Sequence, residues 1–217
     1  MKVAVLLSGH AREWRSCWNS LNQNLIEPNN ADVFIHSYES DDSKELVEIL
    51  RPKKFVFEKQ NEVEVNESLY NINMPDNLKY IINPISSVYM FRKIKLCFDL
   101  LEENYDAVIK TRFDCKYTEI LNVKELDIDS YTIPTGGDYE NGIFDMFCVS
   151  SYDNMKHYCG LYENIVSYLH KEIPLHSEIL LKHHLTGRKI NRVDYNIILR
   201  KVFDNSWPED KVFNVRW

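Results

Sequence analysis

Short apolar runs alternate with amphipathic segments along most of the chain. The runs at residues 2–7, 31–38 and 53–58, and a shorter one at residues 107–109, are rich in β-branched and aromatic side chains. Runs of this kind form strands that are buried on both faces of a sheet. We therefore predict four strands, of which the first and the fourth are buried, with Asp106 at the entry of the fourth, which we take as the central strand.

Between these runs, apolar side chains recur three and four residues apart, as they do on one face of a helix. The spacing predicts helices over residues 14–25, 43–50, 86–101, 153–169 and 176–185. Ser43, and either Ser86 or Ser87, are suitable N-cap residues, because a serine hydroxyl can accept a hydrogen bond from a first-turn amide. Pro28, with Asn29 and Asn30, is expected to end the first of these helices, and Pro174 the fourth.

The remaining segments are shorter or less regular. We predict strands at residues 131–134 and 143–150, and one or two closing strands within residues 189–203. Residues 59–84 are polar and lack a clear period, so we expect a long excursion beside the sheet. Residues 135–142 hold three of the six glycines, which would allow a ligand to approach the backbone closely.

Length and composition are those of one folded globular domain. At 217 residues the chain is long enough for one domain and short for two, and 44% of its residues are hydrophobic and 27% charged. No repeat or linker divides it. We therefore predict a single α/β domain over residues 1–217, with a mostly parallel, Rossmann-like central sheet flanked by helices.

Charge and hydropathy argue against several classes of partner. The net charge is −7, so the surface as a whole would repel nucleic acid and anionic membranes. No segment approaches the roughly 20 apolar residues that span a bilayer, and MKVAVLLSG has too short an apolar core for a signal peptide. The five cysteines are widely spaced without any C-x-x-C pair, so reduced, buried thiols are expected. We expect a cytoplasmic protein that neither binds nucleic acid nor inserts into a membrane.

Polar residues gather where three of the predicted strands end. They are Ser8, Gly9 and Arg12 after the first strand, His36 at the end of the second, and Arg112 and Asp114 after the central strand. In open α/β sheets, ligands bind outside the carboxyl ends of the strands. Helix amides and a guanidinium group at such a place favour an anion such as a diphosphate. The alternatives are an ordinary turn with a solvated arginine after the first strand and a simple ion pair between Arg112 and Asp114.

Several stretches together resemble a known enzyme family. They are VAVLLSGHAR near the N-terminus, DVFIHSY, SSVYMFRKIKLC leading into YDAVIKTRFD, GIFDMFCVSS, and HSEILLKHHL. In this combination the chain resembles the GT-A-fold glycosyltransferases of large DNA viruses, chloroviruses in particular, and the resemblance covers most of the chain. It implies a GT-A-like fold and transfer of a sugar from a nucleotide-diphosphate sugar, such as a UDP-sugar, to a glycan or glycoprotein acceptor. It also implies a divalent metal, Mn²⁺ or Mg²⁺, and, for a viral protein, a location in the host-cell cytosol.

The resemblance assigns roles to the residues at the strand ends. GT-A enzymes commonly carry Asp-x-Asp after the central strand, and its last carboxylate binds the metal that holds the diphosphate. Here the triplet is Arg112-Phe113-Asp114, so Asp114 alone carries over as a metal ligand, and Arg112 is expected to neutralise part of the phosphate charge. Arg12 and Lys93 are expected to add positive charge. Residues 1–117 would then form the half that binds the donor, and residues 118–217 the half that faces the acceptor.

An inverting reaction needs a carboxylate that accepts the proton of the acceptor hydroxyl. Asp145, beside the glycine-rich loop, is the first candidate, and Glu178, at the start of its helix, is the second. His176 is a candidate for completing the metal site, as late histidines do in several GT-A families. Each has a structural alternative: Asp145 can cap the preceding loop, Glu178 can stabilise a helix N-terminus, and His176 can be a hydrogen-bonded structural side chain.

Two other functions stay open. The chain can be a catalytically silent nucleotide- or glycan-binding module of a larger assembly. A nucleotidyltransferase would need a glycine-rich basic loop for a triphosphate, of which residues 8–12 are a poor version, and the sequence contains neither G-x-G-x-x-G after a strand nor a P-loop. Tyr38, Tyr89 and Tyr139 are candidates for stacking on a base or a sugar, although most of the 13 tyrosines must be structural.

Overall fold

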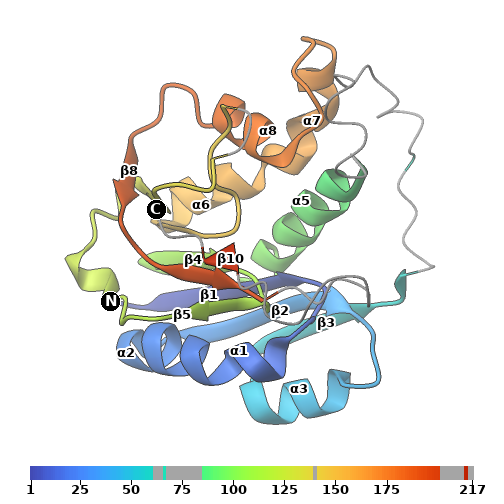
Figure 1. Cartoon of the computed structure of the whole chain (residues 1–217). Coiled ribbons are helices and arrows are strands. Elements are labelled where there is room, and N and C mark those ends of the chain that lie inside the picture. Colours follow the sequence, from blue (N-terminus) through green and yellow to red (C-terminus); the bar gives the residue numbers. More distant parts are fainter. Residues whose placement is uncertain (61–65, 67–84, 139–140, 201–212, 215–217) are drawn as a thin grey trace.

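The computed structural model describes residues 1–60, 66, 85–138, 141–200 and 213–214. At its centre lies a seven-stranded sheet in the order β3-β2-β1-β4-β7-β6-β8 (Figure 1). The strands are β1 Val3–Gly9, β2 Asp32–Tyr38, β3 Lys54–Glu58, β4 Ala107–Thr111, β6 Tyr131–Pro134, β7 Cys148–Ser150 and β8 Ile190–Val193. In this sheet β7 runs antiparallel to β4 and β6, and the other pairs are parallel. The predicted mostly parallel, Rossmann-like α/β sheet is therefore confirmed.

A small antiparallel sheet stands beside the large one. It contains β5 Cys115–Tyr117, β9 Ile197–Leu199 and β10 Phe213–Asn214, in the order β10-β9-β5. The closing tail thus supplies one strand to each sheet, because β8 pairs with β6 while β9 pairs with β5. The main sheet includes strands from residues 1–117 and from residues 118–217, so the two predicted halves share one sheet.

Helices cover both faces of the main sheet, as Figure 1 shows. On one face α5 Ile85–Phe98 packs against β1 and β2, and α6 Tyr152–Cys159 packs against β4 and β7. Outside them, α7 Leu161–Leu169 packs on α5 and α6, and α8 Ser177–His184 packs on α7. The opposite face carries α1 Trp14–Leu21, which also contacts β5, and α3 Ser43–Leu50.

The core lies around β1 and β4, whose side chains are buried between the two helical layers. In β1, Val5, Leu6 and Leu7 are fully buried, and every residue of β4 is buried, including Lys110 and Thr111. Burying an aliphatic side chain of this size contributes about 1.5–3 kcal/mol, which explains why these runs form the central strands. The five cysteines are likewise buried and unpaired, as predicted.

The strand order creates a crevice between β1 and β4. From β1 the chain passes through α1 to β2 on one side, whereas β4, on the other side of β1, is reached through α5. Figure 1 shows α1 and α5 on opposite faces of the sheet. Neighbouring strands whose connections leave to opposite faces separate at their carboxyl ends, and ligands of open α/β sheets bind there.

The first helix is less regular than predicted. After α1 the chain continues through a π-helical turn, η1 Asn22–Ile26, and a last short helix, α2 Glu27–Asn29, so Pro28 lies inside the helical run. The buried Asn29 amide donates to the carbonyls of Leu25 and Leu121 at 2.7 Å each, and this tertiary contact carries the helix past the proline. The helix ends at Asn30, which is left-handed with φ 45°.

Residues 153–169 form two helices, not one. The break is at Gly160, whose φ of −66° and ψ of −6° end α6 before α7 begins. Glycine is about 1 kcal/mol worse than alanine inside a helix, so the apolar period alone overestimated the length of this helix. The predicted N-cap at Ser43 is also wrong, because Ser43 is the first residue of α3 and Asp42 precedes it as the cap.

The predicted strand at residues 143–150 is wrong in its first half. Only β7 is a strand, and Ile143, Phe144 and Phe147 are buried as part of a loop. The amide of Ile143 donates to the carbonyl of Glu178 at 3.1 Å, and the amide of Phe144 donates to Asp138 at 2.9 Å. These partners replace a strand ladder. Most of the predicted excursion at residues 59–84, and Tyr139, lie outside the described residues.

Candidate functional site

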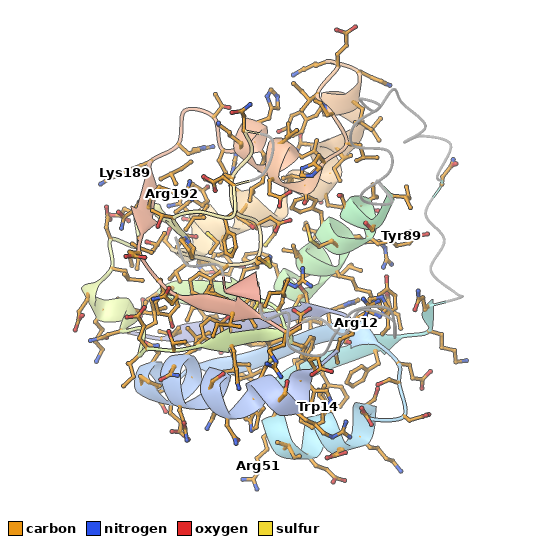
Figure 2. All side chains as sticks on the ribbon, in the orientation of Figure 1. Arg12, Trp14, Arg51, Tyr89, Lys189 and Arg192 are labelled. Atoms are coloured by element: carbon orange, nitrogen blue, oxygen red, sulfur yellow. The ribbon has the colours of Figure 1, made fainter. Side chains whose placement is uncertain are left out.

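A pocket of about 510 Å³ opens at the carboxyl ends of β1 and β4; we call it the strand-end pocket. This volume lies within the roughly 300–1,000 Å³ that small-molecule sites occupy. It is formed by the turn after β1, the first half of α5 and the segment after β4. Figure 2 shows Arg12 and Tyr89 at this end of the molecule and Lys189 and Arg192 at the other. Six residues of the predicted site line the pocket: Ser8, Gly9, Arg12, Lys93, Arg112 and Asp114.

The turn after β1 depends on two left-handed residues. Gly9 has φ 98°, a conformation that side chains rarely tolerate, and its carbonyl accepts a 2.7 Å hydrogen bond from the Ser37 hydroxyl of β2. Glu13, with φ 51°, then starts α1, and its carbonyl accepts from the amides of Ser16 and Cys17. The chain therefore reverses outside the end of the strand, which leaves His10 and Arg12 at the pocket.

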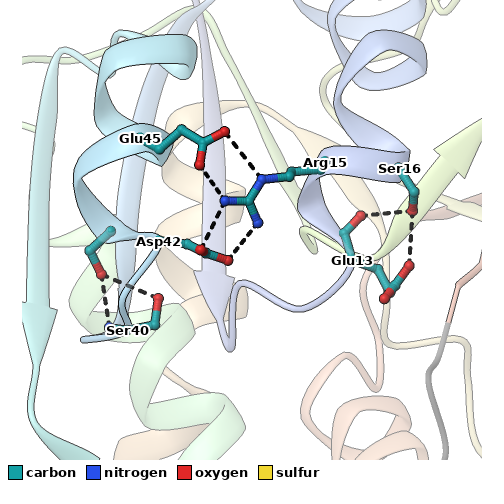
Figure 3. Close-up of polar contacts among 7 residues, drawn as sticks. Glu13, Arg15, Ser16, Ser40, Asp42 and Glu45 are labelled. Atoms are coloured by element: carbon teal, nitrogen blue, oxygen red, sulfur yellow. Dashed lines mark hydrogen bonds and ion pairs between the residues drawn. The ribbon is translucent and has the colours of Figure 1, made fainter.

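Arg15 fastens α1 to the start of α3, outside the pocket (Figure 3). Its guanidinium donates to both oxygens of Asp42, at 2.6 and 2.8 Å, and also to both oxygens of Glu45. All three side chains are more than 40% exposed, at 48%, 44% and 47%. This cluster is therefore a surface ion-pair network that positions α1 and does not reach the pocket.

Tyr38 forms an aromatic wall of the pocket between two nitrogen-bearing side chains. Its ring centroid is 4.5 Å from that of His10, and the Lys93 ammonium lies 3.8 Å above the ring. A cation at this distance from an aromatic face is favourable, and more so when it is desolvated. Lys93 is 1% exposed, so Tyr38 both shapes the pocket and stabilises a buried charge.

Glu58, at the end of β3, holds the basic residues of α5 in place. It accepts hydrogen bonds from Lys93 at 2.7 Å and from two nitrogens of Arg92 at 2.8 and 3.2 Å. Burial opposes the shift, but the hydrogen bonds from Arg92 and Lys93 lower the pKa of Glu58 to about 2. His36 lies behind this group, with its Nε2 3.7 Å from Glu58, and does not line the pocket. Burial, and then the Lys93 charge, lower the pKa of His36 to about 4.

Arg112 and Asp114 form a bidentate pair after β4. The guanidinium Nε and one terminal nitrogen donate to the two carboxylate oxygens at 2.8 and 2.7 Å. Asp114 is 3% exposed, whereas the Arg112 side chain is 29% exposed. Although burial opposes it, the Asp114 carboxylate raises the pKa of Arg112. The predicted alternative of an ion pair is thus what the structure has, and the pair lies in the pocket wall.

The field inside the pocket is positive although the protein carries a net charge of −7. Burial and the charges of Arg12, Lys93 and Arg112 lower the pKa of His10 to about 4, and Asp114 only partly opposes them. At neutral pH His10 is therefore an uncharged hydrogen-bonding group among cations. The three positive charges that, besides burial, disfavour an imidazolium would favour an anion.

Asp145 and Glu178 lie together in a second cluster, next to the pocket but not in its lining. Lys110, which lines the pocket, donates to the main-chain carbonyl of Asp145, and Ser177 Oγ donates to Glu178 at 2.9 Å. His176, the N-cap of α8, places its Nδ1 3.0 Å from Glu178. Asp145 is 6% exposed, and burial and the Glu178 carboxylate raise its pKa, while Lys110, Ser177 and Arg112 oppose the rise.

The residues predicted to hold a metal do not form a ligand set. Both oxygens of Asp114 already accept from Arg112, and His176 pairs with Glu178. Among the described residues, no group of three or more His, Cys, Asp or Glu side chains is arranged to hold a metal ion. The metal role of Asp114 and His176 stays a prediction, and no step below depends on it.

Sequence reasoning missed residues that act on the site through space. Glu58 ends a strand far from the predicted clusters, and Lys110, at the carboxyl end of the central strand, was given no role of its own. Ser177 stands between two residues that were predicted and bonds one of them. His10 was visible in the motif after β1 but has no role there until its neighbours are known.

Another hollow, of about 540 Å³, lies at the amino ends of β2 and β3, where Trp18, Asp32 and Arg51 are among its lining residues. It is at the wrong end of the parallel strands for a ligand site of an open α/β sheet. We therefore assign the candidate site to the strand-end pocket.

No helix in the described part of the chain is long and apolar enough to span a bilayer. A search of curated proteins gave no match to the chain. A family model, described as a domain of unknown function (DUF7796), matches residues 1–200, which include both sheets up to β9 and the whole strand-end pocket. The chain therefore belongs to the DUF7796 family of domains of unknown function.

Proposed function

We propose that the protein is a glycosyltransferase that moves a sugar from a nucleotide-diphosphate sugar, such as a UDP-sugar, to a glycan or glycoprotein acceptor. The observation that carries the proposal is the strand-end pocket. It lies at the crevice between β1 and β4, and basic and aromatic residues line it. The sequence resemblance to GT-A glycosyltransferases supports it independently.

The lining of the pocket matches the parts of such a donor. Tyr38 and Tyr89 offer aromatic surface to a base or sugar, and Arg12, Lys93 and Arg112 offer positive charge to a diphosphate. The diphosphate is also the leaving group of the reaction, so cations that surround it stabilise the charge that develops as the bond to the sugar breaks. The donor would therefore be held and activated by the same side chains.

The Asp145 and Glu178 cluster supplies the base for an inverting transfer. As the acceptor oxygen forms its bond to the anomeric carbon, the bond to the diphosphate breaks, and a carboxylate takes the acceptor proton. Glu178, with an 18% exposed side chain, is the more accessible of the two, and Asp145 is 6% exposed. We therefore assign proton acceptance to Glu178, with Asp145, whose pKa is raised, beside it.

A catalytically silent binding module is the second candidate. The burial of Asp145 and the pairing of Asp114 with Arg112 favour it, because neither carboxylate then meets a ligand directly. Such a module would bind a nucleotide sugar and leave it intact.

The test is a panel of UDP- and GDP-sugars incubated with the purified protein, with Mn²⁺ and with EDTA, read by release of the nucleoside diphosphate. Glu178→Gln is expected to lower turnover by roughly 10²–10⁴-fold, the usual contribution of a general base, and to leave donor binding unchanged. Glu163→Gln, at a 62% exposed position on α7, is the matched control. Binding without any turnover, in the wild type and both variants, would leave the silent module as the function.

A further inference from the structure

The place where a metal is expected is already held by a cation of the protein. Arg112 donates to both oxygens of Asp114, at 2.8 and 2.7 Å, and Asp114 is almost completely buried. A divalent ion bound there would have to approach the carboxylate past a guanidinium of like charge. Arg112 cannot be neutralised by losing a proton under ordinary conditions, so this competition persists at working pH.

Arg112 keeps donors for a second partner. A guanidinium has five N–H groups in a planar fork, and the bonds to Asp114 occupy only one edge of that fork. The Arg112 side chain is 29% exposed and lines the strand-end pocket. Asp114 thus orients the guanidinium, while its remaining N–H groups can bind phosphate oxygens.

The pocket also holds cations that exceed their local partners. Arg92 and Lys93 share the single carboxylate of Glu58, which leaves that group with a net positive charge. Arg12 lines the pocket, is exposed, and pairs with no carboxylate among the residues that the structure describes. The first turns of α5 line the pocket as well, and the dipole of the helix adds positive potential at this end.

These charges come from three separate segments and act at one point. Arg12 follows β1, Lys93 lies on α5 and Arg112 follows β4, and all three disfavour protonation of His10. A nucleotide sugar carries a negative charge on each of its two phosphates. The excess positive charge of the pocket matches this charge without a further cation.

We propose that the strand-end pocket binds the diphosphate of a nucleoside diphosphate or nucleotide sugar without a divalent metal, with Arg112 and Arg12 as the phosphate ligands and Asp114 as the residue that positions Arg112. The proposal deepens the proposed function and rests on it. It replaces the metal-binding role that the sequence predicted for Asp114 with a positioning role.

The first test is isothermal titration of the full chain with UDP and with GDP, each in EDTA and in Mn²⁺, and the nucleotide that binds is compared between the two conditions. We expect the two dissociation constants to agree within about threefold, or less than 1 kcal/mol. Affinity at least about tenfold higher in Mn²⁺ would overturn the inference and leave the proposed function standing. If UDP and GDP fail to bind in either condition, the proposed function fails together with this inference.

Variants separate the two roles. Arg12→Gln should weaken UDP binding in EDTA by about tenfold or more, the cost of losing a charged hydrogen bond. Arg15→Gln is the matched control, because Arg15 lies three residues further on in the surface network of Figure 3 and should leave UDP affinity unchanged. Since Arg12 is exposed, its variant is expected to fold. Equal affinity of wild type and Arg12→Gln would contradict the proposal.

Asp114→Asn distinguishes positioning from metal binding. Asp114→Ala removes the acceptor that orients Arg112 and should weaken UDP binding in EDTA by about tenfold. Asp114→Asn, whose oxygen can still accept from Arg112, should restore part of this loss. Loss of a Mn²⁺-dependent gain in affinity in this variant would show that Asp114 is a metal ligand and would overturn the proposal.

Discussion

Two arginines in this protein make the same contact in different surroundings. Arg112 donates to both oxygens of Asp114 at the edge of the strand-end pocket, and Arg15 donates to both oxygens of Asp42 and of Glu45 on the surface between α1 and α3. Asp114 is almost completely buried, whereas Asp42 and Glu45 are 44% and 47% exposed. The two ion pairs therefore have similar geometry, but we expect them to contribute different free energies to stability.

The difference teaches which of the two pairs serves a site. Exposed ion pairs contribute about 0–1 kcal/mol, because water and salt screen them. Removing one partner of a buried pair costs about 3–5 kcal/mol, because an uncompensated charge stays behind. At the pocket, the buried Asp114 carboxylate also holds the Arg112 guanidinium in one orientation. The N–H groups of Arg112 that do not bond Asp114 can then bind a ligand.

The largest expected effect is that of Arg112→Ala. It leaves the buried Asp114 carboxylate without its partner, so the free energy of unfolding should fall by about 3–5 kcal/mol. Urea denaturation followed by circular dichroism measures this change. In the double variant Arg112→Ala with Asp114→Ala the loss should be smaller than the sum of the single losses, since no charge is left unpaired. A loss below about 1 kcal/mol for Arg112→Ala would place this pair in the same class as the surface pair.

Glu58→Gln should have the next largest effect. It removes the carboxylate that compensates the buried Lys93, and a hydrogen bond to a charged group is worth about 1.5–3 kcal/mol. The pKa of Glu58 in the folded protein, about 2, lies below its ordinary value. Its stabilising contribution is therefore present above the ordinary value near 4.5 and is lost as the pH falls towards 2.

Acid titration of stability checks this sign. Wild-type stability should fall between pH 4.5 and 2 more steeply than that of Glu58→Gln, so that the two curves converge towards pH 2. Parallel curves over this range would mean that Glu58 carries no such linkage.

Gly9→Ala tests backbone strain at the pocket. With φ at 98°, alanine would be held in a conformation that costs on the order of 1–3 kcal/mol. Gly187→Ala is the control, because Gly187 has φ 78° and, like Gly9, would have no atom within 4 Å of an added Cβ. Both variants should lose similar stability by thermal denaturation, but only Gly9→Ala should weaken UDP binding. Equal UDP affinities for the two variants would show that the conformation of the turn at Gly9 does not affect UDP binding.

The smallest effect is expected for Arg15→Ala. Its partners are exposed and remain hydrated, so the loss of stability should be far smaller than that of Arg112→Ala, and smaller still at high salt. Urea denaturation at low and high salt measures it. A loss as large as that of Arg112→Ala would refute the distinction between buried and exposed pairs.

Much of the fold could be read from local patterns. The period of apolar residues located α3 at residues 43–50 and β6 at residues 131–134 with the bounds that the structure has, and it placed β1, β2 and β4 within two residues. It failed where tertiary contacts replace local ones. Asn29 carries the first helix past Pro28 through contacts with residue 121, and residues 143–147 are buried as a loop because Asp138 and Glu178 satisfy its amides.

The candidate site divides in the same way. Residues after β1 and β4 were recognisable because parallel neighbouring strands bring their carboxyl ends together, so Ser8, Gly9, Arg12, Arg112 and Asp114 indeed share a pocket. His36, at the end of β2, faces Glu58 instead. Tertiary packing decides which way a side chain at a strand end points and which residue it contacts. The spacing of residues in the sequence does not encode this packing.

By itself, the sequence determined the α/β class, the parallel arrangement of the central strands and the edge of the sheet where charged residues gather, because these follow from hydrophobic period and strand direction. Only the tertiary structure decided what the charges do. It brought Glu58 within hydrogen-bond distance of Lys93 and Ser177 within hydrogen-bond distance of Glu178, and it paired the Arg112 guanidinium with Asp114. Burial is the physical reason, since the strength of a charge–charge contact depends on the water that the folded chain removes from it.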